Sequence, residues 1–252
     1  MAAVTAITER LVALRARVTQ SCLRAGRDPA GIRIVAVCKT HPPAAIRAAQ
    51  AAGLTDFGEN YVQEAMAKIT QLPTGLRWHF IGALQANKTR AVAGHFDWVQ
   101  TLASAQVAQR LSDQRPFHGG ALQVCLQVQP VPAGTRGGVP AGQLQALAAQ
   151  VAGLPRLKLR GLMFMPQAGL DEPGLRAEFR RVHGLFEALR AAGHDLDTLS
   201  MGMSDDLEMA IAEGSTMLRV GTALFGARPA AAPQARCSDD SGRGGSSDDP
   251  GP

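Results

Sequence analysis

The sequence predicts an α/β protein built as a single (β/α)8 TIM-type barrel with an extra N-terminal helix. Over residues 32–220 of the 252-residue chain, short apolar runs alternate with amphipathic stretches, which is typical of strand and helix units around a parallel sheet. Eight such strands suit a barrel of roughly 250 residues. An open doubly wound sheet is the alternative, but no G-x-G-x-x-G turn follows the first strand.

The elements follow from this alternation of patterns. A helix is expected first, over residues 6–25. The apolar runs predict strands at residues 32–38, 56–57, 77–81, 98–101, 122–128, 159–163, 198–200 and 217–220. The amphipathic stretches predict helices at residues 44–52, 60–70, 86–93, 105–112, 143–152, 174–192 and 205–213.

The barrel is expected to occupy residues 1–228 as the only domain. From residue 229 the composition changes to Ala, Pro, Ser, Gly and Asp, which predicts a disordered tail over residues 229–252. The tail carries more Asp than Arg. The whole chain has a net charge of +5 and the tail contributes −2, so the barrel is the basic part, at +7.

Composition argues against several classes of protein. The basic residues are scattered and aromatic residues make up 4% of the chain, so neither a basic run nor a stacking platform for nucleic acid is expected. The four cysteines are far apart in sequence, which favours reduced thiols over a zinc site or a disulfide framework. With neither a signal peptide nor a membrane-spanning run expected, we predict a cytoplasmic protein.

Lys39 ends the first predicted strand and is the first candidate for chemistry. The preceding run, Ile34 to Cys38, is apolar enough for a strand buried on both faces. Desolvation lowers the pKa of a lysine, and a neutral amine attacks an aldehyde to form a Schiff base. The alternative is a structural lysine whose stem packs on the core while its ammonium group reaches water.

The loops after the seventh and eighth strands are candidates for binding a phosphate. Ser200 begins a Gly-containing turn, and Arg219 precedes Gly221 and Thr222. Barrels often bind phosphate in these two loops, at the N-terminus of a short extra helix. The acids at 205 and 206 could instead be simple helix caps.

A lysine on one side of a barrel mouth and a phosphate site on the other suit pyridoxal 5′-phosphate (PLP). A phosphosugar aldolase would use the same parts together with further acid or base groups. Glu59, Tyr61 and His79 could serve an aldolase in that role. The residues alone leave both possibilities open.

Six blocks make the resemblance to a known family specific: AVCKT (36–40), FGENYVQE (57–64), WHFIGALQANK (78–88), RGLM (160–163), LSMGMSDD (199–206) and RVGTALFG (219–226). Together they resemble the pyridoxal phosphate homeostasis protein family. The resemblance implies a barrel like the N-terminal domain of alanine racemase and PLP as the cofactor, held on Lys39. Family members are regarded as PLP carriers or homeostasis factors without established catalytic activity.

The resemblance also implies roles for individual residues. Ser200, Gly221 and Thr222 would bind the phosphate, Arg219 the pyridine nitrogen or its surroundings, and Asn60 the ring region. His79 and Met201 complete the expected cofactor-binding set. The partners implied are PLP itself and PLP-dependent apoenzymes, and we expect a monomer.

Two positions depart from the family pattern. Cys38 replaces a serine or similar small residue before the lysine, and Arg136 lies where the family commonly has a lysine. A second lysine for cofactor transfer is therefore not expected in this chain.

A PLP-dependent racemase or lyase is the alternative function. A racemase needs a second base on the opposite face of the substrate, usually a tyrosine from another domain or subunit. Tyr61 is the only tyrosine, and no second domain is predicted. We therefore expect a carrier rather than an enzyme.

Overall fold

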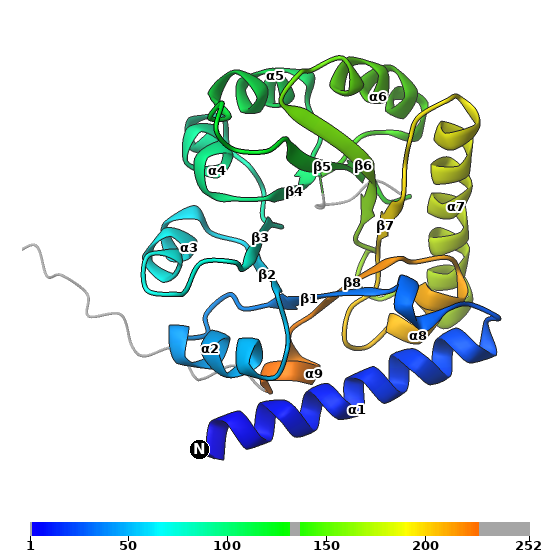
Figure 1. Ribbon diagram of the computed structural model, residues 1–252. Coiled ribbons are helices and arrows are strands. Elements are labelled where there is room, and N and C mark those ends of the chain that lie inside the picture. Colours follow the sequence, from blue (N-terminus) through cyan, green and yellow to red (C-terminus); the bar gives the residue numbers. More distant parts are fainter. Residues whose placement is uncertain (1, 132–136, 227–252) are drawn as a thin grey trace, which may run out of the picture.

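A closed ring of eight parallel strands forms the centre of the protein (Figure 1). The computed structural model describes residues 2–131 and 137–226. The strands are β1 Arg33–Val37, β2 Asp56–Glu59, β3 Arg77–Phe80, β4 Trp98–Leu102, β5 Leu122–Val128, β6 Leu157–Phe164, β7 Thr198–Ser200 and β8 Met217–Val220. Because β8 pairs with β1, the sheet has no free edge and the open doubly wound alternative is excluded. The predicted barrel is confirmed.

The helices surround the ring on its outer face (Figure 1). They are α1 Ala2–Arg24, α2 Pro43–Ala51, α3 Val62–Ile69, α4 Thr89–His95, α5 Ala105–Gln114, α6 Leu144–Ala152, α7 Glu172–Ala191, α8 Leu207–Ala212 and α9 Thr222–Phe225. Three short 3-10 turns are η1 Pro29–Gly31, η2 Ala86–Lys88 and η3 Ala141–Gln143. The single helix predicted at 86–93 is wrong in detail, because η2 and α4 divide that segment.

The predicted helix at 205–213 also begins later than expected, at Leu207. The Asp206 carboxylate accepts a hydrogen bond from the Met203 N–H at 2.5 Å. Asp206 is thereby held in a turn before the helix, as Asp residues often are at helix starts. Of the other predictions, the tail at 229–252 and the departure at residue 136 lie outside the described residues.

The side chains of each strand alternate between two parts of the core, one between strands and helices and one inside the ring. On β1, Ala36 and the following Cys38 belong to the large core between the strands and the helices. Val35 belongs instead to a small cluster inside the ring, with Trp98, Cys125, Met163 and Met217. Successive side chains point to opposite faces of a strand, so every second residue of β1 faces the barrel axis.

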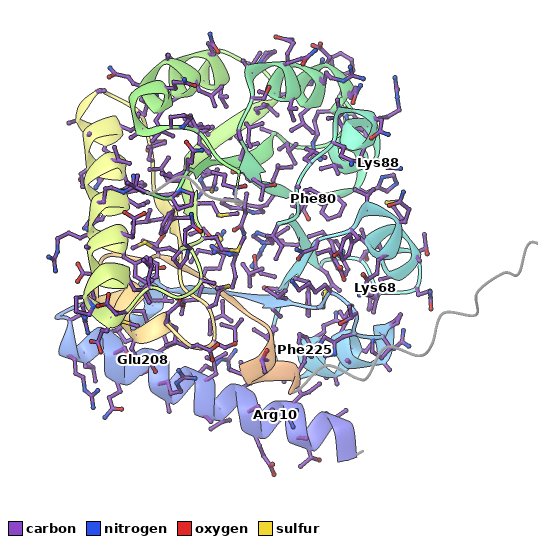
Figure 2. The ribbon with its side chains drawn as sticks, turned by 180° about the vertical axis from the view of Figure 1, so that it is seen from behind. Arg10, Lys68, Phe80, Lys88, Glu208 and Phe225 are labelled. Carbon is purple, nitrogen blue, oxygen red and sulfur yellow. The ribbon has the colours of Figure 1, made fainter. Side chains whose placement is uncertain are left out.

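α1 packs along one side of the barrel, across α2, α8 and α9 (Figure 1). Its buried residues Ile7, Leu11, Leu14 and Val18 repeat every three or four positions and so form one apolar stripe. Figure 2 shows Phe225 of α9 close to the helix that carries Arg10. In the described part of the chain no helix is both long enough and apolar enough to cross a bilayer.

Gly82 lets the end of β3 approach the end of β2. A Cβ atom at residue 82 would lie 2.0 Å from the carbonyl oxygen of Asn60. No side chain can occupy that space, so glycine is required where the two strands end side by side. This contact fixes the backbone of Asn60 at the carboxyl end of the barrel.

Candidate functional site

A cavity of about 300 Å³ lies at the carboxyl ends of the strands. It is lined by Val37, Lys39, Asn60, Ile81, Met163, Met165, Met203, Ser204, Asp205, Arg219, Gly221 and Thr222. The lining combines apolar side chains with an amine, a guanidinium group, an amide, a carboxylate and two hydroxyls. Small-molecule sites are commonly built this way, with a few polar groups set in an apolar wall.

Lys39 lies two residues beyond the end of β1. Val35 and Val37 face the interior of the barrel, so the alternation of the strand continues to Lys39 and directs it to the cavity. The side chain is half-buried. Thr40, the next residue, has φ +66°, an uncommon conformation for a residue with a Cβ atom. The chain therefore turns sharply just after Lys39.

Arg219 on β8 forms the buried end of the cavity. Its Nη1 donates to the Ser200 carbonyl oxygen at 2.8 Å and to the Ser200 Oγ at 2.7 Å, and its Nη2 donates to the Phe164 carbonyl oxygen at 2.8 Å. The residue is 4% exposed. These bonds fix the planar guanidinium group, which stays charged in proteins.

A chain of hydrogen bonds continues from Arg219 along the barrel axis. The Ser200 hydroxyl donates to Gln100 Oε1 at 2.7 Å, and Gln100 Nε2 lies 3.0 Å from His79 Nδ1. His79 Nε2 lies 3.0 Å from Asp56 Oδ1. Because the Gln100 amide donates to Nδ1, the neutral His79 ring carries its proton on Nε2 and donates to Asp56. His79 is thus satisfied on both nitrogens inside the barrel.

The loops after β7 and β8 meet at the cavity. The Ala223 N–H, in the first turn of α9, donates to Ser204 Oγ at 3.2 Å. Gly221 and Thr222 line the same region. The hydroxyls of Ser204 and Thr222 therefore lie beside the start of a helix, where backbone N–H groups have no helical partners.

Asn60 presents an unsatisfied atom at the cavity. Its Oδ1 is buried and has no hydrogen-bond partner among the described residues. A buried polar atom without a partner is costly. A bound molecule with a hydrogen-bond donor at this point would remove that cost.

The structure brings together five of the eight residues predicted for the site: Lys39, Asn60, Arg219, Gly221 and Thr222. Ser200 and His79 are fully buried in the axial chain and do not line the cavity. Met201 packs in the core outside the ring, and its N–H donates to the Met217 carbonyl oxygen. Their predicted cofactor contacts stay predictions.

Seven lining residues were not predicted: Val37, Ile81, Met163, Met165, Met203, Ser204 and Asp205. Ser204 follows Ser200 by four positions in the same sequence block. Only the position at which β7 ends shows that Ser200 belongs to the strand and Ser204 to the loop after it. Met163, Met165 and Met203 supply apolar wall. They carry no motif, and a methionine in a sequence is more often a core residue.

A second hollow, of about 370 Å³, lies at the opposite ends of the strands. Of the four arginines that line it, Arg77 and Arg160 form ion pairs with carboxylates. Arg77 donates to both oxygens of Asp56, and Arg160 does the same to Asp197. In barrels this face serves stability, whereas function lies at the carboxyl ends.

Comparisons with known proteins show the family of the chain. The profile for the N-terminal domain of alanine racemase matches residues 10–229. A pyridoxal phosphate homeostasis protein of Pseudomonas aeruginosa is 50% identical over 228 residues, covering 90% of this chain and 98% of its own. The chain belongs to the pyridoxal phosphate homeostasis protein family. A member of this family from Escherichia coli K12 is 46% identical over 226 residues, 88% of this chain and 97% of its own.

Solved structures extend the comparison. PipY of Synechococcus elongatus with PLP bound is 40% identical, with a TM-score of 0.76 over 87% of this chain and 100% of its own. Alanine racemase of Corynebacterium glutamicum is 18% identical, with a TM-score of 0.65 over 90% of this chain and 62% of its own. The second likeness concerns the fold alone.

The pKa of His79 predicts how stability depends on pH. Burial lowers this pKa below the ordinary value of 6.5, and the hydrogen bond with Asp56 offsets burial only in part. Below pH 6.5 the His79 ring therefore binds a proton in the unfolded chain more readily than in the native protein. The free energy of unfolding consequently falls as the pH falls. Urea unfolding between pH 5 and pH 8 should show this slope for the unaltered protein.

The variant His79→Gln should lose that slope, and it should be about 1–3 kcal/mol less stable at neutral pH because a buried network is broken. His118→Gln is the matched control, since His118 is exposed. An unchanged pH slope in His79→Gln would contradict this account of His79.

Proposed function

We propose that the chain binds PLP through Lys39 and holds it for use by PLP-dependent enzymes. One observation carries the proposal: a single cavity has Lys39, Arg219 and the Ser204–Thr222 region in its lining. An amine, a fixed cation and a pair of hydroxyls beside a helix start match, in kind, the aldehyde, ring and phosphate of PLP. The relatives named for pyridoxal phosphate homeostasis and the PLP-bound PipY support this choice.

The donor set fits PLP more closely than it fits a phosphosugar. PLP supplies an aldehyde, with whose carbon a lysine nitrogen forms a C=N bond while the oxygen leaves as water. Asn60 Oδ1 has no partner among the described residues and would accept a hydrogen bond from a ring substituent. The methionines of the lining give the flat ring apolar contacts.

The phosphate would bind between Ser204, Thr222 and the backbone at Gly221. Charge-assisted hydrogen bonds from hydroxyls and backbone N–H groups to a phosphate are strong. Asp205 also lines the cavity, but it is exposed to solvent. Water and salt therefore screen its repulsion of a phosphate.

The site is built to hold the cofactor rather than to catalyse a reaction on it. Arg219 keeps its charge and disfavours protonation of a pyridine nitrogen beside it, which weakens the ring as an electron sink. Tyr61, the sole tyrosine, is 61% exposed and does not line the cavity. A second base on the other face of a substrate, which a racemase needs, is therefore not offered by Tyr61.

We place this activity in the cytoplasm, with PLP-dependent apoenzymes as recipients and the monomer as the working form. Cys22, Cys38 and Cys125 are unpaired and buried, as suits a reducing compartment. The monomer is proposed because the amine, the guanidinium group and the hydroxyls that PLP needs already line one cavity of a single chain.

One prediction from the proposed function concerns the point of attachment. The protein loaded with PLP should be yellow, and borohydride should fix the cofactor to the peptide that contains Lys39. Lys68 is paired with two carboxylates, so it should carry no label. Peptide mass spectrometry of the reduced protein measures this, and label on Lys68, Lys88 or Lys158 instead would refute the assignment.

The second prediction distinguishes the two serines. Ser204→Ala and Thr222→Val should each weaken PLP binding by about 10- to 100-fold, the effect of losing one charge-assisted hydrogen bond. Pyridoxal lacks the phosphate, so its affinity should stay within about twofold. Equilibrium dialysis with both compounds measures this.

Ser200→Ala is the comparison variant, because Ser200 is occupied by Gln100 and Arg219. It should weaken PLP and pyridoxal alike through Arg219. If Ser200→Ala weakened PLP alone and Ser204→Ala had no effect, the phosphate site would be Ser200, as the sequence suggested.

The third prediction concerns catalysis. Loaded protein incubated with L-alanine, L-serine or L-threonine in deuterated water should incorporate no deuterium at Cα at enzymatic rates, roughly 1 s⁻¹ or above. Exchange is read by NMR or mass spectrometry. Steady exchange or D-isomer formation that Lys39→Ala abolishes would restore the racemase or lyase alternative.

A further inference from the structure

One ion pair on α3 holds the backbone on both sides of Lys39. The ammonium group of Lys68 donates to the carbonyl oxygen of Cys38 at 2.7 Å and to Glu64 Oε1 at 2.6 Å. The same Glu64 oxygen accepts the N–H of Thr40 at 2.5 Å. The residues before and after Lys39 are thus tied to two side chains one helical turn apart.

The tie is anchored in the core by Glu59. Lys68 Nζ lies 2.6 Å from Glu59 Oε1, and the Cys38 thiol donates to the same oxygen at 3.1 Å. Glu59 is fully buried and the Lys68 side chain is 7% exposed; Figure 2 labels Lys68 on α3. Burial alone would lower the pKa of Lys68, but its bonds to Glu59 and Glu64 outweigh burial and raise it. Lys68 therefore remains a cation.

The backbone that is tied down is strained. Thr40 has φ +66° and is the only non-glycine residue with positive φ among the described residues. Such a conformation is unfavourable and persists only where its surroundings impose it. The bond from the Thr40 N–H to Glu64 is a charge-assisted bond of the kind that can impose it.

We propose that Glu64 and Lys68 are positioning residues that hold the Lys39 turn so that its amine meets the aldehyde of PLP. The inference rests on the proposed function. Neither residue lines the cavity, so their effect on PLP passes through the backbone of residues 38–40. We call the contacts of Glu64 and Lys68 with the backbone of Cys38 and Thr40 the clamp. Without the clamp the turn would relax, and the Lys39 amine would no longer be held in position for the aldehyde.

Glu64→Met is the decisive variant. Methionine keeps the length of the side chain and suits a helix, but it removes the acceptor. Because the Glu64 side chain is 27% exposed, we expect this variant to fold. Glu172→Met on α7 is the matched control, because it breaks an exposed ion pair with Arg176 far along the chain. Two ligands are compared: PLP, and pyridoxine 5′-phosphate, which has the ring and phosphate but no aldehyde.

Glu64→Met should weaken PLP binding and slow its attachment by about tenfold, the effect of one lost charged hydrogen bond. The affinity for pyridoxine 5′-phosphate should stay within about twofold, because the cavity itself is intact. In the unloaded protein, amide hydrogen exchange at Thr40 should become at least about tenfold faster. Glu172→Met should change none of these three quantities.

Lys68 provides the second arm of the test. Lys68→Met leaves Glu59 as an uncompensated buried charge and is expected to destabilise the fold, whereas Lys68→Arg keeps the cation and should restore PLP attachment to within about threefold of the unaltered protein. Equal weakening of both ligands by Glu64→Met, or no change in either, would overturn the clamp. Failure of the unaltered protein to bind PLP would instead overturn the proposed function, and the exchange at Thr40 would still test the clamp.

Discussion

The pairing of β8 with β1 is the constraint on which the site depends. In the parallel register of the two strands Ala36 is opposite Val220, so the chain leaves both strands at the same end of the barrel. Lys39 and the Gly221–Thr222 turn are about 180 residues apart in sequence, yet they line one cavity. An open sheet would leave β1 and β8 apart, and neither loop alone has the groups to hold PLP.

Closure of the ring also explains the polar interior. Strands of a barrel place every second side chain on the axis, where a buried charge is costly unless its hydrogen bonds are met. Arg219 donates hydrogen bonds to two carbonyl oxygens and to the Ser200 hydroxyl. Gln100 and His79 extend this chain of hydrogen bonds to Asp56. The axis is therefore a fixed support beneath the cavity. A cation held so rigidly suits the retention of a flat aromatic ligand.

The sequence was sufficient for the barrel and for the residues at the strand ends. The alternation of apolar runs and amphipathic stretches predicted all eight strands, and the carboxyl-end rule then selected Lys39, Arg219, Gly221 and Thr222 as cavity residues. It did not separate from them Ser200 and His79, which are fully buried on the barrel axis and do not line the cavity. Which face a residue at the end of a strand occupies depends on the register with its neighbours, and a three-residue strand such as β7 gives too short a pattern to read it.

The clamp from α3 lay beyond sequence reasoning for a related reason. Glu64 and Lys68 are four residues apart, which indicates an ordinary surface ion pair on a helix. Only the rotation and height of α3 against β1 bring that pair to the backbone at Cys38 and Thr40. Both quantities are set by packing in the core, not by the helix itself.

The most direct test of the account is a crystal structure of the protein loaded with PLP. Continuous electron density should join Lys39 Nζ to the cofactor, and the phosphate should lie within hydrogen-bonding distance of Ser204, Thr222 and the backbone at Gly221. Arg219 should face the pyridine nitrogen with its bonds to Ser200 unchanged. Attachment at another lysine, or a phosphate bound in the arginine-lined hollow at the opposite end of the barrel, would contradict it.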